Sequence, residues 1–363
     1  MKVSIVGPAH PYKGGGARHT TELAHRLRTA GHDVVIESWR AQYPARLYPG
    51  QQTVDEPEGE PFPATRRRLA WYRPDGWFAA GRRLRRADLV VFALITPIQV
   101  PAYLTMLAAL RHRARVVVIC HNVLPHERRP GDVPLVRALL RRADSVVVHS
   151  AEQAGLARSL APRTPVAVAA LPPHLPVTVA PVPTAPDGPG VRLLFFGIVR
   201  PYKGLDVLLR ALAEVPQTVT LTVAGEFWGG PAGTEKLIAE LGIGDRVTLR
   251  PGYVPASEIP ALFAAADVLV LPYREATASQ NALLAFAHGV PVITTTAGRL
   301  AEHVMDGVNG ITAAPGDADD MLRALRAVSE PATVARLRSG VRPVDPGPAW
   351  SDYLRALVTV ART

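Results

Sequence analysis

Two basic side chains occupy a glycine-bounded turn in the second half of the chain, within FGIVRPYKG at residues 196–204. The apolar run Val191–Phe196 predicts a β-strand before this turn, and Leu205–Ala213 predicts a helix after it. Arg200 and Lys203 therefore stand between a strand and the helix that follows it. Two cations in such a place can neutralise a diphosphate leaving group, although two solvated turn residues would give the same pattern.

A second polar loop is LPYREATASQNALL at residues 271–284, which starts at the end of the predicted strand Val268–Leu271. Ser279 or Thr277 can cap the helix that follows, and the free N–H groups at a helix N-terminus suit a phosphate. Helix capping alone would also explain these hydroxyl groups. The loop side chains able to hold sugar hydroxyls are Glu275, Gln280 and Asn281.

The first half contains a glycine-rich turn, GPAHPYKGGGARHT, at residues 7–20. A strand, then Gly14, Gly15 and Gly16, then a helix is an arrangement that lets backbone N–H groups approach an anionic oxygen. The spacing matches neither the G-x-G-x-x-G nor the G-x-x-x-x-G-K-[ST] pattern, so it predicts neither a dinucleotide site nor a P-loop. A flexible turn is the alternative.

His121 directly follows the apolar run Val116–Cys120. A histidine at the carboxyl end of a strand faces the edge at which open α/β sheets bind ligands. A structural role for His121, or a functional role for His126 instead, remains open.

Asp317 and Asp319 spell a D-x-D pattern, which some metal-dependent transferases use to hold a divalent ion. Here the two residues open a predicted helix, where acidic side chains interact favourably with the helix dipole. We therefore expect no metal at this pair and no cofactor.

Predicted strands alternate with predicted helices along both halves of the chain, and these elements must position the residues above. This alternation predicts an α/β protein with doubly wound parallel sheets. The first half has an expected helix at Thr20–Thr29 and an irregular stretch at residues 41–76. Its predicted strands are Val3–Val6, Val34–Glu37, Leu89–Ile95, Val116–Cys120 and Val146–His149. Those of the second half are Val191–Phe196, Thr218–Ala224, Val247–Leu249, Val268–Leu271 and Val290–Thr294.

The proline-rich stretch at residues 173–189 predicts a linker between two domains. We expect a Rossmann-like domain at residues 1–172 and a second one at residues 190–348. The last segment, residues 349–363, predicts an amphipathic helix. Because open α/β sheets bind ligands at the carboxyl ends of their strands, two such domains would leave a ligand cleft between them.

Basic residues are concentrated in the first half of the chain. The net charge is +10, with 25 Lys+Arg against 13 Asp+Glu in residues 1–175 and 16 against 18 in residues 176–363. This charge favours an anionic acceptor or an acidic membrane surface, unless it merely reflects a bias toward arginine. No helix-turn-helix or zinc spacing accompanies it, so we expect no nucleic-acid partner.

One uncharged stretch, Leu89–Leu110, is long enough to span a bilayer. Pro97 and Pro101 interrupt it, so we expect a buried strand, a loop and a core helix instead. The single cysteine, Cys120, excludes an internal disulfide, and the first residues read as a buried strand rather than a signal peptide. These features predict a cytoplasmic protein, with peripheral attachment to the inner face of the membrane as a further expectation.

Taken together, these motifs resemble the family 4 retaining glycosyltransferases (glycosyl transferases group 1) of the GT-B fold. The strongest parts are FFGIVRPYKG at residues 195–204 and the run 271–310, which includes HGVPVI at 288–293 and DGVNG at 306–310. The resemblance covers nearly the whole chain. It implies transfer of a sugar, with retention, from a UDP- or GDP-sugar bound mostly by the second domain, and a C-terminal helix that crosses back onto the first domain.

The resemblance also implies roles for individual residues. Arg200 and Lys203 would contact the donor diphosphate in place of a metal ion. The loop containing Gly15 and Gly16 would close over the reacting centre, and His121 would lie near the transferred sugar. The other donor-binding residues would be Tyr253 and Val254, whose backbone would read the base, with Glu275, Thr277, Ser279, Gln280 and Asn281.

Two features depart from the usual pattern of this family. The family often has two glutamates separated by seven residues, and the corresponding positions here are Ala276 and Leu284, with Glu275 one position away. Arg200 also stands two positions later than in the commoner arrangement. The missing glutamate leaves a non-catalytic subunit that binds a nucleotide sugar as one alternative, and a sugar-nucleotide epimerase is the other.

Overall fold

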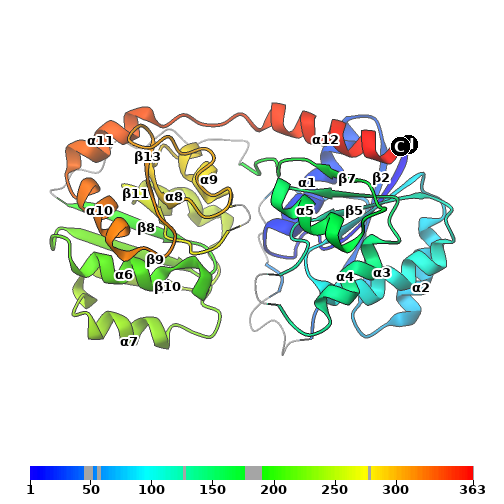
Figure 1. Cartoon of the computed structure of the whole chain (residues 1–363), viewed down its shortest axis with the longest axis horizontal. Helices are drawn as coiled ribbons and strands as arrows, with labels where there is room; N and C mark the ends of the chain where they lie inside the picture. The colour runs from blue at the N-terminus through cyan, green and yellow to red at the C-terminus, as the bar shows by residue number, and fades with distance from the viewer. Residues whose placement is uncertain (45–51, 55–58, 126–127, 176–189, 277–278, 363) are drawn as a thin grey trace. The chain divides into compact units, whose positions relative to one another are not determined.

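The computed structural model describes residues 1–44, 52–54, 59–125, 128–175, 190–276 and 279–362. The chain, coloured from blue to red along its sequence in Figure 1, divides into two compact units. The first unit consists of Met1–His174 and Pro346–Thr363, and the second of Leu175–Asp345. Most of the expected linker, residues 173–189, lies outside the described residues.

The described part of the first unit contains a parallel sheet in the order β3-β2-β1-β4-β5-β6-β7. The strands are β1 (Lys2–Val6), β2 (Asp33–Ala41), β3 (Thr65–Ala70), β4 (Leu89–Leu94), β5 (Arg115–Cys120), β6 (Ser145–Val148) and β7 (Val166–Val168). The helices are α1 (Gly15–Thr29), α2 (Pro74–Leu84), η2 (Pro97–Gln99), α3 (Val100–Leu110), α4 (Asp132–Leu140), α5 (Ala151–Leu160) and α12 (Pro346–Arg362).

Both faces of this sheet are covered, as a doubly wound sheet requires. On one face, Val3 and Ile5 of β1 belong to a buried cluster with residues of α1 and α12. On the other face, Val6 of β1 belongs to a cluster with residues of α2, α3, α4 and α5. Alternation along a single strand therefore places apolar side chains in two separate cores.

The second unit repeats the arrangement, with a parallel sheet in the order β10-β9-β8-β11-β12-β13 among the described residues. Its strands are β8 (Val191–Phe196), β9 (Val219–Gly225), β10 (Val247–Pro251), β11 (Val268–Leu271), β12 (Val292–Thr295) and β13 (Gly310–Ala313). Its helices are η3 (Pro201–Lys203), α6 (Leu205–Ala213), α7 (Ala232–Glu240), η4 (Gly244–Arg246), η5 (Ala256–Glu258), α8 (Ile259–Ala264), α9 (Asn281–Ala287), α10 (Ala318–Val328) and α11 (Pro331–Gly340).

The prediction that residues 41–76 are irregular was wrong for the end of this stretch. This stretch contains β3 and the start of α2, and β3 has the sequence TRRRLA, in which only Leu69 and Ala70 are buried. An edge strand needs only one neighbour and can expose most of its side chains, so it lacks an apolar period. The helix expected at Thr20–Thr29 also begins earlier, at Gly15.

The uncharged stretch Leu89–Leu110 forms β4, η2 and α3, as expected. In the described part of the chain, no helix combines the length and the apolar character that crossing a bilayer would need. The C-terminal helix α12 packs on the first unit through Trp350, Tyr353 and Leu357, which are at most 1% exposed.

Candidate functional site

The two polar loops of the second half follow neighbouring strands. Strand β8 leads into the loop that contains Arg200 and Lys203, and β11 leads into the loop that starts at Pro272. The two strands pair in parallel, and the strand order turns in opposite directions on either side of this pair. Open α/β sheets bind ligands outside the carboxyl ends of the strands at such a switch point.

Arg274, in the second loop, fixes the first loop. Its guanidinium donates to both carboxylate oxygens of Asp206 at 2.7 Å and to the carbonyl oxygen of Pro201 at 3.0 Å. Its backbone N–H also donates to the carbonyl oxygen of Tyr202 at 2.7 Å. The Arg274 guanidinium holds the pKa of the Asp206 carboxyl below its usual value. These contacts hold the turn at residues 200–204 in one conformation.

Lys203 and Asn281 converge on the bare backbone of Gly197. A Cβ atom added to Gly197 would lie 3.5 Å from the Nζ of Lys203 and 3.3 Å from the Nδ2 of Asn281. The Nδ2 of Asn281 donates to the carbonyl oxygen of Phe196 at 2.9 Å, and Lys203 Nζ lies 4.9 Å from the centre of the Tyr273 ring. The arrangement places an ammonium and an amide beside a stretch of backbone that has no side chain.

Arg200 lies against aromatic rings at the same end of the sheet. Its guanidinium carbon is 4.3 Å from the centre of the Trp228 ring and 5.7 Å from that of Tyr202. Stacking on a ring fixes the plane of a guanidinium group, which suits it to binding an anionic oxygen in a defined direction. Trp228 follows β9 and belongs to no motif that would identify it from the sequence.

The structure describes one of the two capping candidates of the second loop, Ser279. The N-cap of α9 is Gln280, which makes no side-chain capping hydrogen bond and has near-helical backbone angles. Ser279 precedes the cap, and its hydroxyl oxygen is 3.4 Å from the N–H of Asn281, at the limit of a hydrogen bond. The other candidate, Thr277, lies outside the described residues. Glu275 is exposed.

Tyr253 and Val254 follow the edge strand β10 and are half-buried. The preceding Gly252 has φ 125° and donates its N–H to the carbonyl oxygen of Gly225 at 3.0 Å. A Cβ atom on Gly225 would lie 1.9 Å from the carbonyl oxygen of Gly197, so the ends of β8 and β9 approach closely. In the sheet order β10-β9-β8, strand β9 lies between β10, which Tyr253 and Val254 follow, and β8, which leads into the loop of Arg200 and Lys203.

In the first unit, the glycine-rich turn leads directly into α1. Gly14 is the N-cap with φ 96°, and both Gly14 and Gly15 are exposed. A Cβ atom on Gly15 would meet nothing within 4 Å, whereas one on Gly16 would lie 2.5 Å from the Cδ1 of Ile95. Packing therefore explains the glycine at position 16, and the open space beside Gly15 leaves a helix N-terminus accessible to an anion.

His121 follows β5, is half-buried, and lies among three buried histidines, His19, His149 and His174. The ring centres of His19 and His121 are 4.9 Å apart, and those of His121 and His149 are 5.2 Å apart. Burial, with the neighbouring imidazoles, holds the pKa of His19 and of His121 well below the usual value. The Nε2 of His121 is shielded from solvent and has no hydrogen-bond partner among the described residues.

The C-terminal helix α12 completes this histidine group. The Nε2 of His19 lies 3.1 Å from the hydroxyl of Tyr353, and the His19 ring stacks on Trp350 with centres 5.4 Å apart. Of these four histidines, only His121 was predicted from the sequence to lie at a site. One signal was present, because His149 follows the next strand, β6, as His121 follows β5.

The D-x-D pattern forms a helix cap. The Asp317 carboxylate accepts hydrogen bonds from the N–H groups of Asp319 and Asp320, both at 3.0 Å, at the start of α10. Within the ranges that the structure describes, no group of three or more histidine, cysteine or acidic residues is placed to hold a metal ion.

Comparison with protein families gives two matches that together span most of the chain. Residues 190–330 match the family described as "Glycosyl transferases group 1", and residues 13–172 match "Glycosyltransferase Family 4". The chain belongs to the family 4 glycosyltransferases. The family that the motifs of both units suggested is thereby confirmed.

Two relatives illustrate the similarity within the family. The chain is 32% identical over 183 residues to D-inositol 3-phosphate glycosyltransferase 1 of Catenulispora acidiphila, covering 47% of this chain and 44% of that protein. It is 32% identical over 251 residues to the GDP-mannose-dependent alpha-(1-6)-phosphatidylinositol monomannoside mannosyltransferase of Mycolicibacterium smegmatis, covering 62% and 64%. The chain thus spans less than half of the first relative and under two thirds of the second.

Solved structures confirm the GT-B fold. Sucrose-phosphate synthase from Thermosynechococcus elongatus superimposes with a TM-score of 0.71 at 18% identity, covering 100% of this chain and 97% of that one. HepE of Anabaena, solved in complex with UDP and glucose, gives a TM-score of 0.70 at 18% identity, covering 100% and 98%.

Proposed function

We propose that this family 4 glycosyltransferase transfers a sugar, with retention, from a UDP- or GDP-sugar to an anionic acceptor without a metal ion. The observation that carries the proposal is the convergence of Lys203 and Asn281 on the backbone of Gly197 at the switch point of the second unit. The stacked guanidinium of Arg200 follows the same strand. Retention is the stereochemical course that the family resemblance implies.

The charge of these residues suits a diphosphate leaving group. As the bond to the sugar breaks, negative charge develops on the diphosphate, and fixed cations stabilise that charge without reorganising. The turn at residues 200–204 is held by Arg274, so its cations are positioned before a donor binds. Cations held in this way would supply the charge stabilisation that a divalent ion supplies in other transferases.

The printed names of two similar proteins support the donor class. The Mycolicibacterium smegmatis relative is named as dependent on GDP-mannose, and the Anabaena structure contains UDP. The acceptor proposal has similar support, because the names of the Catenulispora acidiphila and Mycolicibacterium smegmatis relatives both contain a phosphorylated inositol. The basic first half of the chain would attract such an anion.

The first test is a thermal-shift screen of the whole chain against UDP, GDP and ADP and their common sugar conjugates, in buffer without metal. A ligand that binds only the folded state raises the melting temperature by mass action. A shift with one nucleotide class would identify the donor, and NMR of the transferred sugar would then report the anomeric configuration. An inverted product would contradict retention, and no shift at millimolar concentrations would contradict the donor site.

A non-catalytic nucleotide-sugar-binding subunit is the second candidate. It is favoured by one observation: Ala276 and Leu284 occupy the positions at which the family often has glutamates. Donor binding without turnover, across a panel of phosphorylated acceptors, would support this candidate over the transferase. Conversion of the donor to an isomer of equal mass would instead identify an epimerase.

We also propose a cytoplasmic location with peripheral contact to an acidic membrane. Trp71, Tyr72 and Phe78 expose 41%, 51% and 48% of their surface around the β3–α2 turn, close in sequence to several arginines. Aromatic side chains beside cations are typical of surfaces that contact lipid headgroups. Flotation with phosphatidylglycerol vesicles tests this proposal. The variant Trp71→Ala/Phe78→Ala should bind the vesicles less than the native chain does. Equal flotation of the native chain with neutral vesicles would contradict the proposal.

A further inference from the structure

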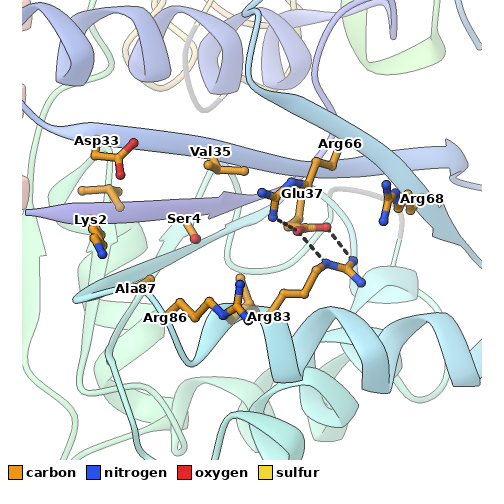
Figure 2. Close-up of a pocket in the computed structure, with 12 residues that line it drawn as sticks. Lys2, Ser4, Asp33, Val35, Glu37, Arg66, Arg68, Arg83, Arg86 and Ala87 are labelled. Carbon is orange, nitrogen blue, oxygen red and sulfur yellow. Dashed lines mark hydrogen bonds and ion pairs between the residues drawn. The ribbon is translucent and has the colours of Figure 1, made fainter.

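A basic pocket lies on the first unit, between strands β1–β3 and the end of α2 (Figure 2). Its volume is about 420 Å³, within the range of small-molecule sites. The cations that line it are Lys2, Arg66, Arg68, Arg83 and Arg86. Among the lining residues the carboxylates are Asp33 and Glu37, so the lining carries three more positive than negative charges.

The pocket forms where the sheet face is polar and α2 is short. In β1 and β2, Ser4, Val35 and Glu37 face the pocket, whereas Val34 and Ile36 point into the apolar core on the opposite face. Parallel strands of a doubly wound sheet are normally apolar on both faces. Helix α2 ends at Leu84, and Arg83 and Leu84 of its last turn line the pocket.

A buried ion pair forms the floor of the pocket. The Glu37 side chain is 1% exposed, and Arg83 binds it through two hydrogen bonds, from Nε to Oε1 at 2.9 Å and from Nη2 to Oε2 at 2.8 Å. The Nη1 of Arg66 donates to the same Oε1 at 3.2 Å. One carboxylate therefore orients two guanidinium groups, as the dashed lines in Figure 2 show.

These contacts leave the two arginines able to bind a further anion. Each guanidinium carries five N–H donors, and the contacts with Glu37 use two from Arg83 and one from Arg66. The side chain of Arg83 is 28% exposed and that of Arg66 is 48% exposed. Arginines that are already oriented lose less conformational entropy when they bind a phosphate, and their planar fork matches its oxygens.

We propose that this pocket binds a phosphate monoester, carried either by a free phosphorylated small molecule or by a phospholipid headgroup. The pocket extends along one face of the sheet, from Lys2 and Asp33 at the starts of β1 and β2 to Glu37, which pairs with Val6 at the end of β1. The glycine turn and His121 follow the carboxyl-terminal ends of β1 and β5. No lining residue of the pocket belongs to the glycine turn, to the histidine group or to the second unit, so the pocket would bind its phosphate ligand in the absence of donor.

The test uses the variant Arg68→Gln/Arg86→Gln, because both side chains are exposed and Glu37 keeps its partners. The matched control is Arg113→Gln/Arg163→Gln, which removes the same charge from exposed positions of the first unit that do not line the pocket. Isothermal titration with glucose 6-phosphate should show affinity reduced by about tenfold or more in the pocket variant, and little changed in the control. Lys203→Ala should bind as the native chain does, which separates this pocket from the donor site.

A parallel arm distinguishes the source of the phosphate. If the ligand is a lipid headgroup, vesicles containing phosphatidic acid should bind the native chain and the control but not the pocket variant, while glucose 6-phosphate does not bind. Loss of ligand binding in either arm that is specific to the pocket variant supports the site. The proposal would be overturned if the control lost binding equally, if neither ligand bound the native chain, or if only Lys203→Ala lost binding. A failed transferase assay would leave this result unaffected.

Discussion

The Nδ1 of His19 lies 3.1 Å from the Nε2 of His174, in the buried interior of the first unit. One of these nitrogens must donate a proton and the other must accept it. The other nitrogen of His19 lies 3.1 Å from the hydroxyl of Tyr353 on α12. One buried imidazole therefore joins α1, the end of the first domain and the C-terminal helix, and its contacts depend on protonation.

Acidification should destabilise the first unit through these histidines. Burial holds the folded-state pKa of His19 and His121 below 6.5, so below that pH the unfolded chain binds more protons than the folded one. Stability should be constant above about pH 7 and fall as the pH drops below 6.5, by about 1.4 kcal/mol per pH unit for each histidine. Urea unfolding between pH 8 and pH 5 measures this.

A matched pair of variants isolates the effect. His19→Gln should reduce the slope of the unfolding free energy with pH, because only His121 of the two then contributes, whereas His303→Gln, at an exposed histidine of the second unit, should leave the slope intact. An unchanged slope in His19→Gln would show that other groups govern the acid sensitivity.

Lys203→Ala should reduce transfer by about two orders of magnitude or more, because it removes a cation from the proposed leaving-group site. The folded state should survive, since the Arg274–Asp206 contacts that hold the turn remain. Lys236→Ala is the control, as Lys236 is an exposed lysine of α7. Native turnover in Lys203→Ala would refute its assignment to the diphosphate.

Arg274→Lys should weaken donor binding while changing stability little. The Arg274 and Asp206 side chains are 38% and 46% exposed, and a solvated ion pair of this kind contributes about 0–1 kcal/mol. Lysine cannot reproduce the bidentate contact or reach Pro201 at the same time, so the turn loses its constraint. The measurement pairs the melting temperature with the donor Kd, and a large loss of stability with native Kd would contradict the positioning role.

Gly204→Ala should be far more damaging than Gly229→Ala. Both glycines have positive φ, 65° and 95°, so both substitutions carry backbone strain of about 1–2 kcal/mol. A Cβ atom at position 204 would also lie 2.0 Å from the carbonyl oxygen of Pro272, whereas one at position 229 meets nothing within 4 Å. Chemical denaturation of the two variants compares them, and equal losses would show that strain alone decides.

Removal of divalent ions should leave transfer unchanged. The proposed mechanism assigns charge stabilisation to Arg200 and Lys203. Assays with EDTA, and with added Mg²⁺ or Mn²⁺ after dialysis, test this. A loss with EDTA that Mg²⁺ restores would show that a metal takes part.

The sequence alone determined the two α/β units, the order of most strands along the chain and the loops of Arg200 and His121. Apolar runs, glycines and prolines act over a few residues, so these features can be recognised locally. The edge strand β3 was missed because its arginines are exposed and leave no apolar period.

Only the tertiary structure decided which of these residues meet. His19 and Tyr353 are 334 positions apart in the sequence, and Asp206 and Arg274 are 68 apart. Glu37 and Arg83 likewise come from β2 and α2. Such contacts depend on the order of strands in each sheet and on how its helices cover the two faces. The periodicity of a single segment carries no information about that order.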